Sequence, residues 1–170
     1  MLTRHHLPVS VSFLSTDLPV WSVVETAGTL YQKDQERFHL LLMEPELGKW
    51  NQIQGLSAFP DKTSQSSKLS VQPRRRLLWL EISPYRVMVT MQGNGSSFSY
   101  RHYWESGVFG LSRFWLHDET LTSGQLCLRN YTRHLKFHQH PIPQSLRIDY
   151  ELWSGNSQLG HYLLNVDIGD

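Results

Sequence analysis

The stretch LRIDYELWSGNSQLGHYLLNVDI, residues 146–168, decides the fold class. Apolar side chains occupy the even-numbered positions on both sides of a Ser-Gly-Asn-Ser break, and mostly polar side chains occupy the odd-numbered ones. Alternation with a period of two on either side of a turn predicts a β-hairpin. Antiparallel partners share a face, so their residue numbers must sum to an even value, which requires a loop of about three or five residues. The longer loop is slightly favoured because it places Arg147 opposite Asp167.

Outward from this hairpin, the chain repeats short alternating segments separated by turn residues roughly every ten positions, which is the spacing of a sandwich or barrel. No convincing amphipathic helix pattern interrupts them. We therefore expect an all-β, single-domain, mainly antiparallel barrel or sandwich of about nine or ten strands. A glycine at position 28 predicts a bulge or bend in its strand. The expected strands before the hairpin are 8–15, 21–31, 37–43, 77–83, 86–92, 97–104, 108–116 and 125–137.

Two segments lack the alternation. Residues 44–73 contain prolines, glycines and a Ser/Gln/Lys-rich second half, and we expect a long, partly mobile connection within a single domain spanning 1–170. Thr63 to Lys68 is the part predicted to be disordered, with early proteolysis at Lys62 or Lys68. Residues 138–145 hold two prolines and are predicted to form an irregular link.

Composition sets broad limits on the class of protein. The chain has 170 residues, 39% hydrophobic and 18% charged, which is typical of a folded domain with a real core. No apolar run approaches the roughly 18 residues of a membrane span, and the start lacks the features of a signal peptide. The single cysteine, Cys127, excludes an internal disulfide and is expected to be an inert, half-buried thiol. Together these features predict a cytoplasmic protein.

The net charge of +1 hides a strong segregation along the chain. Residues 74–147 carry a net charge of +6, whereas the terminal segment 148–170 carries −4. Arginines in the basic part are interleaved with aromatic residues, a combination that can hold carboxylates or phosphates. We predict a ligand- or partner-binding site formed by Arg101, Arg129, Tyr131 and Arg133. The last three share parity and form a row on one strand face, although the buried face is expected to switch near Arg129, as at a bulge.

Motifs for catalysis or metal binding are weak. His138 and His140 form a His-x-His pair, the weak alternative for a metal site, but the glutamate and glycines of the cupin pattern are missing. The run 117–119, His-Asp-Glu, is interpreted as a polar turn. No phosphate loop, nucleophile elbow or paired-cysteine motif is present. We therefore expect no cofactor and no metal, and a protein that leans away from catalysis.

These observations predict a non-enzymatic binding or assembly-factor module that acts through an aromatic- and arginine-rich β surface. The expected partner is a protein or a small anionic ligand. The first alternative is a lipocalin-like carrier of a flat anionic molecule in the barrel interior, although the Gly-x-Trp opening of lipocalins is replaced by Pro19-Val20-Trp21. The second is a single-stranded nucleic-acid binder, which the modest pI of 8.0 does not favour.

Overall fold

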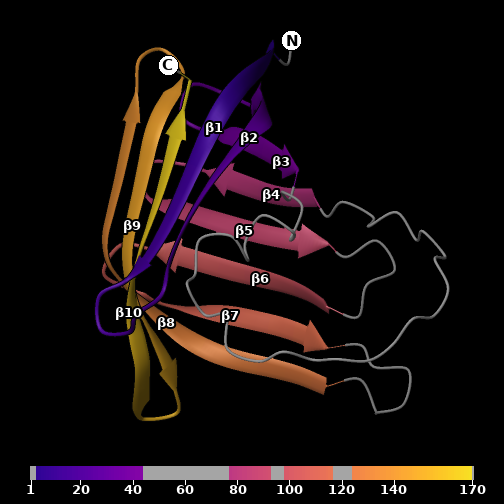
Figure 1. Ribbon diagram of the computed structural model, residues 1–170. Coiled ribbons are helices and arrows are strands. Elements are labelled where there is room, and N and C mark those ends of the chain that lie inside the picture. The colour runs from indigo at the N-terminus through magenta and orange to yellow at the C-terminus, as the bar shows by residue number, and fades with distance from the viewer. Residues whose placement is uncertain (1–2, 44–76, 93–97, 117–123, 170) are drawn as a thin grey trace, which may run out of the picture.

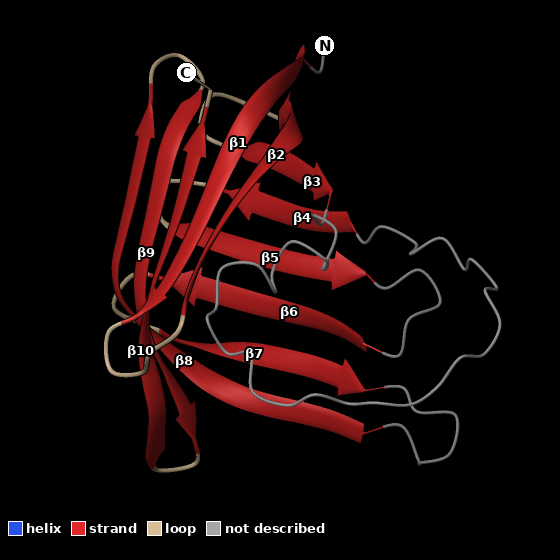
Figure 2. Cartoon of the chain, viewed as in Figure 1, coloured by secondary structure: helices blue, strands red, loops and turns tan. Residues whose placement is uncertain are grey.

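The fold is a closed barrel of ten antiparallel strands in the computed structural model, which describes residues 3–43, 77–92, 98–116 and 124–169. These residues form strands and turns and contain no helix (Figure 2). The predicted all-β fold class is confirmed, and the choice between barrel and sandwich is decided in favour of the barrel. The strands are β1 (Thr3–Ser15), β2 (Trp21–Gln32), β3 (Phe38–Met43), β4 (Leu77–Ile82), β5 (Arg86–Gln92), β6 (Phe98–Glu105), β7 (Phe109–Leu116), β8 (Gly124–Gln139), β9 (Pro143–Ser154) and β10 (Ser157–Ile168).

The topology is a meander in which each strand pairs with its neighbours in the chain, and β1 closes the ring by pairing with β10. Figure 1 shows β1 and β2 beside the long strands β9 and β10, while β3 to β7 fan out from them. Because the barrel is closed, every strand is paired on both sides over at least part of its length. This removes long exposed strand edges, which are a common route to aggregation. The sequence alternation produces this arrangement because each strand offers one apolar face to the interior.

The β9–β10 hairpin has the even register that the alternation requires, but it reaches that register in an unexpected way. Ser154 pairs with Ser157 across a two-residue Gly155-Asn156 turn, and Gly155 has a positive φ of 57°. A bulge between Gln158 and Gly160 then restores the pairing of apolar with apolar positions. Arg147 consequently lies opposite Asn165, so the prediction that it faces Asp167 was wrong.

A second bulge redirects the inner face of β8. The pairing of β8 with β9 shifts between Thr132 and His134, which leaves Arg133 as the extra residue. Before the bulge, even-numbered residues such as Thr132 point inward, and after it odd-numbered residues such as Leu135 do. The expected switch of the buried face therefore exists, four residues beyond the predicted position at Arg129.

Two further local features differ from the predicted ones: Gly28 forms no bulge, and 138–145 is no irregular link. The pairing of β2 runs without a shift through Gly28, which is buried, and a Cβ there would lie 2.6 Å from Val9 Cγ2. Close packing, not a bulge, is therefore the reason for this glycine. The segment 138–145 is not an irregular link: it forms the ends of β8 and β9 and a tight turn that contains a cis His140–Pro141 peptide bond.

The core fills the barrel with apolar side chains from almost every strand. Its fully buried members include Leu30, Phe38, Leu40, Ile148 and Val166. The predicted connection 44–73, with Thr63 to Lys68, and the His-Asp-Glu run at 117–119 lie outside the described residues. Within the described part of the chain, no helix is long and apolar enough to cross a bilayer.

Candidate functional site

The four residues of the predicted site all lie on the outside of the barrel, but the structure brings only three of them together. Arg129 and Tyr131 lie on the outer face of β8, and Arg133 follows at the bulge. Arg101 lies on β6, where it pairs with Arg113 of β7 and hydrogen-bonds through Nε to Thr90 Oγ1 at 3.3 Å. The predicted site is thus a row on β8 with one distant member.

Aromatic side chains surround Arg129. Its guanidinium carbon lies 4.2 Å from the centre of the Phe109 ring, and the Phe109 and Tyr131 ring centres are 5.0 Å apart. Trp153 of β9 lies directly opposite Arg129 in the β8–β9 ladder. Phe109 remains 48% exposed despite these contacts. We call Phe109, Arg129, Tyr131 and Trp153 the outer patch.

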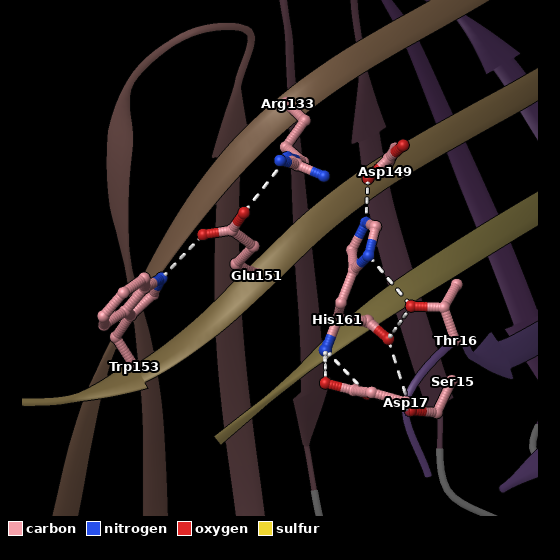
Figure 3. Close-up of polar contacts among 8 residues, drawn as sticks. All are labelled: Ser15, Thr16, Asp17, Arg133, Asp149, Glu151, Trp153 and His161. Atoms are coloured by element: carbon pink, nitrogen blue, oxygen red, sulfur yellow. Dashed lines mark hydrogen bonds and ion pairs between the residues drawn. The ribbon is translucent and has the colours of Figure 1, made fainter. Parts of the chain in front are cut away.

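One edge of the outer patch is fixed by a carboxylate. Figure 3 shows Glu151 accepting a hydrogen bond from Trp153 Nε1 at 3.0 Å and pairing with Arg133 Nε at 3.0 Å. Glu151 lies opposite Tyr131, so it is held directly beside the outer patch. Arg133 therefore has a structural partner, whereas Arg129 contacts an aromatic ring. The sequence pattern suggested equivalent roles for the two arginines, but the structure gives them different partners.

The outer surface of β6 to β9 also contains two like-charge pairs. Arg101 lies directly opposite Arg113, and Lys136 lies directly opposite Arg147, with all four residues exposed. Like charges in such cross-strand positions destabilise a sheet by some tenths of a kcal/mol, up to about 1 kcal/mol. Arg101, Arg113, Lys136 and Arg147 thus lie on the same outer surface of β6 to β9 as the outer patch.

A different group of polar residues lies inside the barrel, which we call the inner polar cluster: His102, Trp104, Ser112, Asn130 and Thr132. Ser112, Asn130 and Thr132 are fully buried, and Asn130 Nδ2 donates to Ser112 Oγ at 2.8 Å. His102 lies opposite Ser112 and stacks on Trp104, with ring centres 5.2 Å apart and planes inclined by 8°. Three adjacent strands, β6 to β8, therefore supply one continuous cluster.

Four buried atoms of the inner polar cluster have no hydrogen-bond partner within the described residues: His102 Nδ1, Trp104 Nε1, Asn130 Oδ1 and Thr132 Oγ1. An unpaired buried polar atom costs about 1–3 kcal/mol. Four of them together would cost an amount comparable with the whole stability of a domain, about 5–15 kcal/mol. The described residues leave these atoms unpaired, and water or a ligand would satisfy them.

The inner polar cluster is electrically neutral. Burial lowers the pKa of His102 to about 4, because the imidazolium form would lose its hydration. His102 as a whole is half-buried, but its Nδ1 atom is buried, which explains why the pKa is lowered. Burial, with smaller contributions from Tyr162 and Tyr100, raises the pKa of Tyr150, which contacts Trp104 at a ring-centre distance of 5.3 Å. Near neutral pH no charged group faces this region among the buried described residues.

A hydroxyl–imidazole–carboxylate chain lies at the β1–β2 turn. Figure 3 shows His161 Nδ1 2.9 Å from Thr16 Oγ1 and His161 Nε2 2.5 Å from Asp149 Oδ1. The order of groups is that of a hydrolase triad. However, the backbone N–H of Thr16 donates to the His161 carbonyl, and the N–H of His161 donates to Asp17. Both N–H groups are therefore already paired and unable to stabilise an oxyanion. The hydrogen-bonded series of Thr16, His161 and Asp149 instead holds the β1–β2 turn against β10.

The remaining candidates carry less chemistry. His138 and His140 are both exposed, and the described residues contain no cluster of three or more metal-ligating side chains. Cys127 is exposed on β8, so the prediction that it is half-buried was wrong. A cleft of 640 Å³ lies between the β2–β3 and β4–β5 turns, but its Asp34 and Arg37 pair with each other. None of these places gathers as many unsatisfied groups as the inner polar cluster.

Sequence reasoning missed the inner polar cluster because polar residues in a strand are normally assigned to the outside. The alternation of Tyr100, His102 and Trp104 was visible, but it did not show which face was buried. Asn130 and Thr132 follow Arg129, where the buried face was expected to switch, so their polar side chains pointed to an outward face. The useful signal was the break in parity on β8, which places the apolar and polar inner residues on one continuous face once Arg133 is recognised as the bulge.

None of the protein-family models and none of the curated proteins compared with the chain matches it. Among solved structures, the barrel is similar to the crystal structure of the ywiB protein from Bacillus subtilis, with a TM-score of 0.61 and 12% sequence identity. The match covers 99% of this chain and 94% of that chain. At this identity the similarity concerns the fold, and function has to be argued from the sites.

Proposed function

We propose that the protein is a non-enzymatic binding module that docks an acidic protein partner on the outer patch. The observation that supports this most directly is the contact between Arg129 and the exposed Phe109, next to Tyr131 and Trp153. Arginine, tyrosine and tryptophan are enriched among residues that dominate binding energy at protein interfaces. The rings and the guanidinium are held before a partner arrives, which reduces the entropy lost on binding.

Charge supports an acidic partner. The pairs Arg101–Arg113 and Lys136–Arg147 flank the outer patch and repel within each pair. A carboxylate-rich segment would relieve this repulsion and steer the encounter. The single cysteine is consistent with a cytoplasmic setting for such a complex.

The test is a photo-crosslinking amino acid at Tyr131 in the host cell, followed by reconstitution of the captured protein with the purified chain. We expect binding to weaken about tenfold or more with Arg129→Gln, as for an interface hot spot. Arg4→Gln is the matched control, because Arg4 also lies over an aromatic ring, that of Tyr31, but on β1. Equal weakening by both variants, or by neither, would contradict the proposal.

Single-stranded nucleic acid is the competing partner, since basic and aromatic side chains also bind it. Fluorescence anisotropy with a labelled single-stranded oligonucleotide separates the two cases. Phosphate-dominated binding weakens steeply between about 50 and 200 mM salt. Tight, salt-sensitive binding that is lost in Arg129→Gln would replace the protein partner with nucleic acid.

A further inference from the structure

The four unpartnered atoms of the inner polar cluster form a complementary set of donors and acceptors. Trp104 Nε1 can only donate a hydrogen bond, and Asn130 Oδ1 can only accept one. Thr132 Oγ1 can do both, and His102 Nδ1 does one or the other according to its tautomer. A molecule that satisfies them must therefore present both an acceptor and a donor.

The surroundings of these atoms select a flat and uncharged molecule. His102 and Trp104 are stacked, and Trp104, Tyr150 and Tyr162 continue the aromatic wall across β9 and β10, with ring-centre distances of 5.3 and 5.5 Å. Aromatic walls favour planar ligands. The buried polar residues of the described chain are all uncharged, so a carboxylate or phosphate would be buried there without a counter-charge.

The number of strands bears on the space inside the barrel. An eight-stranded barrel has an interior that side chains fill or that holds one small molecule, and the diameter grows with the number of strands. This barrel has ten. A small inner residue of β7, Ser112, lies directly opposite the cluster member His102.

We propose that the inner polar cluster binds a neutral, planar heterocycle with a lactam edge, in which a ring N–H lies next to a carbonyl. The carbonyl accepts from Trp104 Nε1, and the N–H donates to Asn130 Oδ1, with Thr132 Oγ1 beside them. This site is separate from the outer patch, because the two lie on opposite faces of the same strands. It also differs from the anionic ligand expected from sequence, since the arginines lie outside.

The experiment uses uracil as a neutral lactam probe and orotate, the same ring with a carboxylate, as its matched control. Binding to the full chain is followed by titration up to about 10 mM, with the Trp104 indole N–H resonance as the local reporter. We expect saturable one-to-one binding of uracil that shifts this resonance, and orotate binding at least about tenfold weaker. No saturable binding of uracil, which would leave water as the occupant, or equal binding of orotate overturns the proposal.

Two variants place the ligand. Thr132→Val preserves shape and removes a buried hydroxyl without a partner, so uracil binding should weaken about fivefold or more while the melting temperature stays equal or rises by a few degrees. Trp104→Phe tests the same contact site by removing the indole Nε1–H group. Unchanged uracil affinity in both variants overturns the assigned site. Arg129→Gln should leave uracil binding unaltered, which separates this inference from the fate of the proposed protein-docking function.

Discussion

Gly110 of β7 occupies a position where a side chain would collide with the backbone. A Cβ built on it would lie 2.1 Å from the carbonyl oxygen of Tyr103 and 3.0 Å from Asn130 Oδ1. We predict that Gly110→Ala lowers the free energy of unfolding by about 1–3 kcal/mol, because the strands would have to move apart. Gly124→Ala is the control, since its Cβ would meet no atom within 4 Å, and it should change stability by less than about 0.5 kcal/mol. Urea unfolding measures both, and equal effects would contradict the steric explanation.

His102 makes stability depend on pH in a defined window. Its pKa is lowered from 6.5 to about 4 by burial, so between these values the unfolded chain binds a proton that the folded barrel does not. Stability should therefore fall as the pH drops from 6.5 to 4, by up to about 3 kcal/mol for the full shift. The lowered pKa values of Asp17 and Asp34 act in a more acidic window, below their ordinary 3.8.

Urea unfolding at several pH values tests this assignment. His102→Gln keeps a polar side chain but cannot take up the proton, so its stability should depend on pH much less than that of the wild-type protein between about pH 6.5 and 4. His138→Gln, at an exposed position on β8, is the control and should follow the wild type. Parallel curves for wild type and His102→Gln would show that other groups control acid stability.

At the scale of elements, alternation predicted the strands well because ten of them bury one face. It failed where local geometry breaks the period. The bulge at Arg133 was predicted only as a change of the buried face a few residues earlier. The bulge at Leu159 was not predicted, because a shorter loop followed by a bulge gives the same register as a longer loop. A period of two cannot distinguish a three-residue loop from a two-residue turn followed by one extra residue.

The bulge at Leu159 leads to a prediction about deletions. Removing Leu159 would leave Gln158 opposite Trp153 and Gly160 opposite Leu152, so every other pair of the β9–β10 hairpin survives. Leu159 is 44% exposed, and its loss costs little core. We expect the deletion to change stability by less than about 1 kcal/mol.

Deletion of Leu163 is the matched control, because it lies within the regular ladder. There the loss of one residue would turn part of β10 inside out, and the protein should not fold. Thermal melting by circular dichroism distinguishes the two variants. A Leu159 deletion that unfolds as completely as the Leu163 deletion would mean that the extra twist of the bulge is required for closing the barrel.

At the scale of the whole molecule, closure separates two chemical environments. The interior holds apolar side chains and a neutral polar cluster, while the basic groups of β6 to β9 face outward. Sequence could predict that arginines and aromatics share strands. It could not predict the inner site, because its residues come from three strands and are recognisable only when closure buries them together.

Closure itself depends on β1, which pairs with β2 from Thr3 to Leu14 but with β10 only from Val9 onward. The carbonyl of Pro8 accepts a hydrogen bond from Gly169 N, so even-numbered residues of β1 direct their backbone polar groups towards β10. Pro8 lies just beyond the paired region, where its missing N–H costs nothing in the ladder. The same parity places the N–H of Ser12 in the seam, opposite Asn165.

Ser12→Pro should therefore open the barrel along the β1–β10 seam. It removes a ladder hydrogen bond, leaves a carbonyl of β10 unpaired and exposes two strand edges, which favours self-association. His6→Pro is the matched control, because His6 has the same parity but lies outside the β10 pairing and its N–H has no partner there to lose. Ser12→Ala isolates the smaller effect of losing the bond from Asn165 Nδ2 to Ser12 Oγ, 3.1 Å long. Size-exclusion chromatography should show self-association for Ser12→Pro alone. Urea unfolding should show that its free energy of unfolding falls by at least about 1–3 kcal/mol. A monomeric, stable Ser12→Pro protein would mean that the β1–β10 seam does not hold the barrel closed.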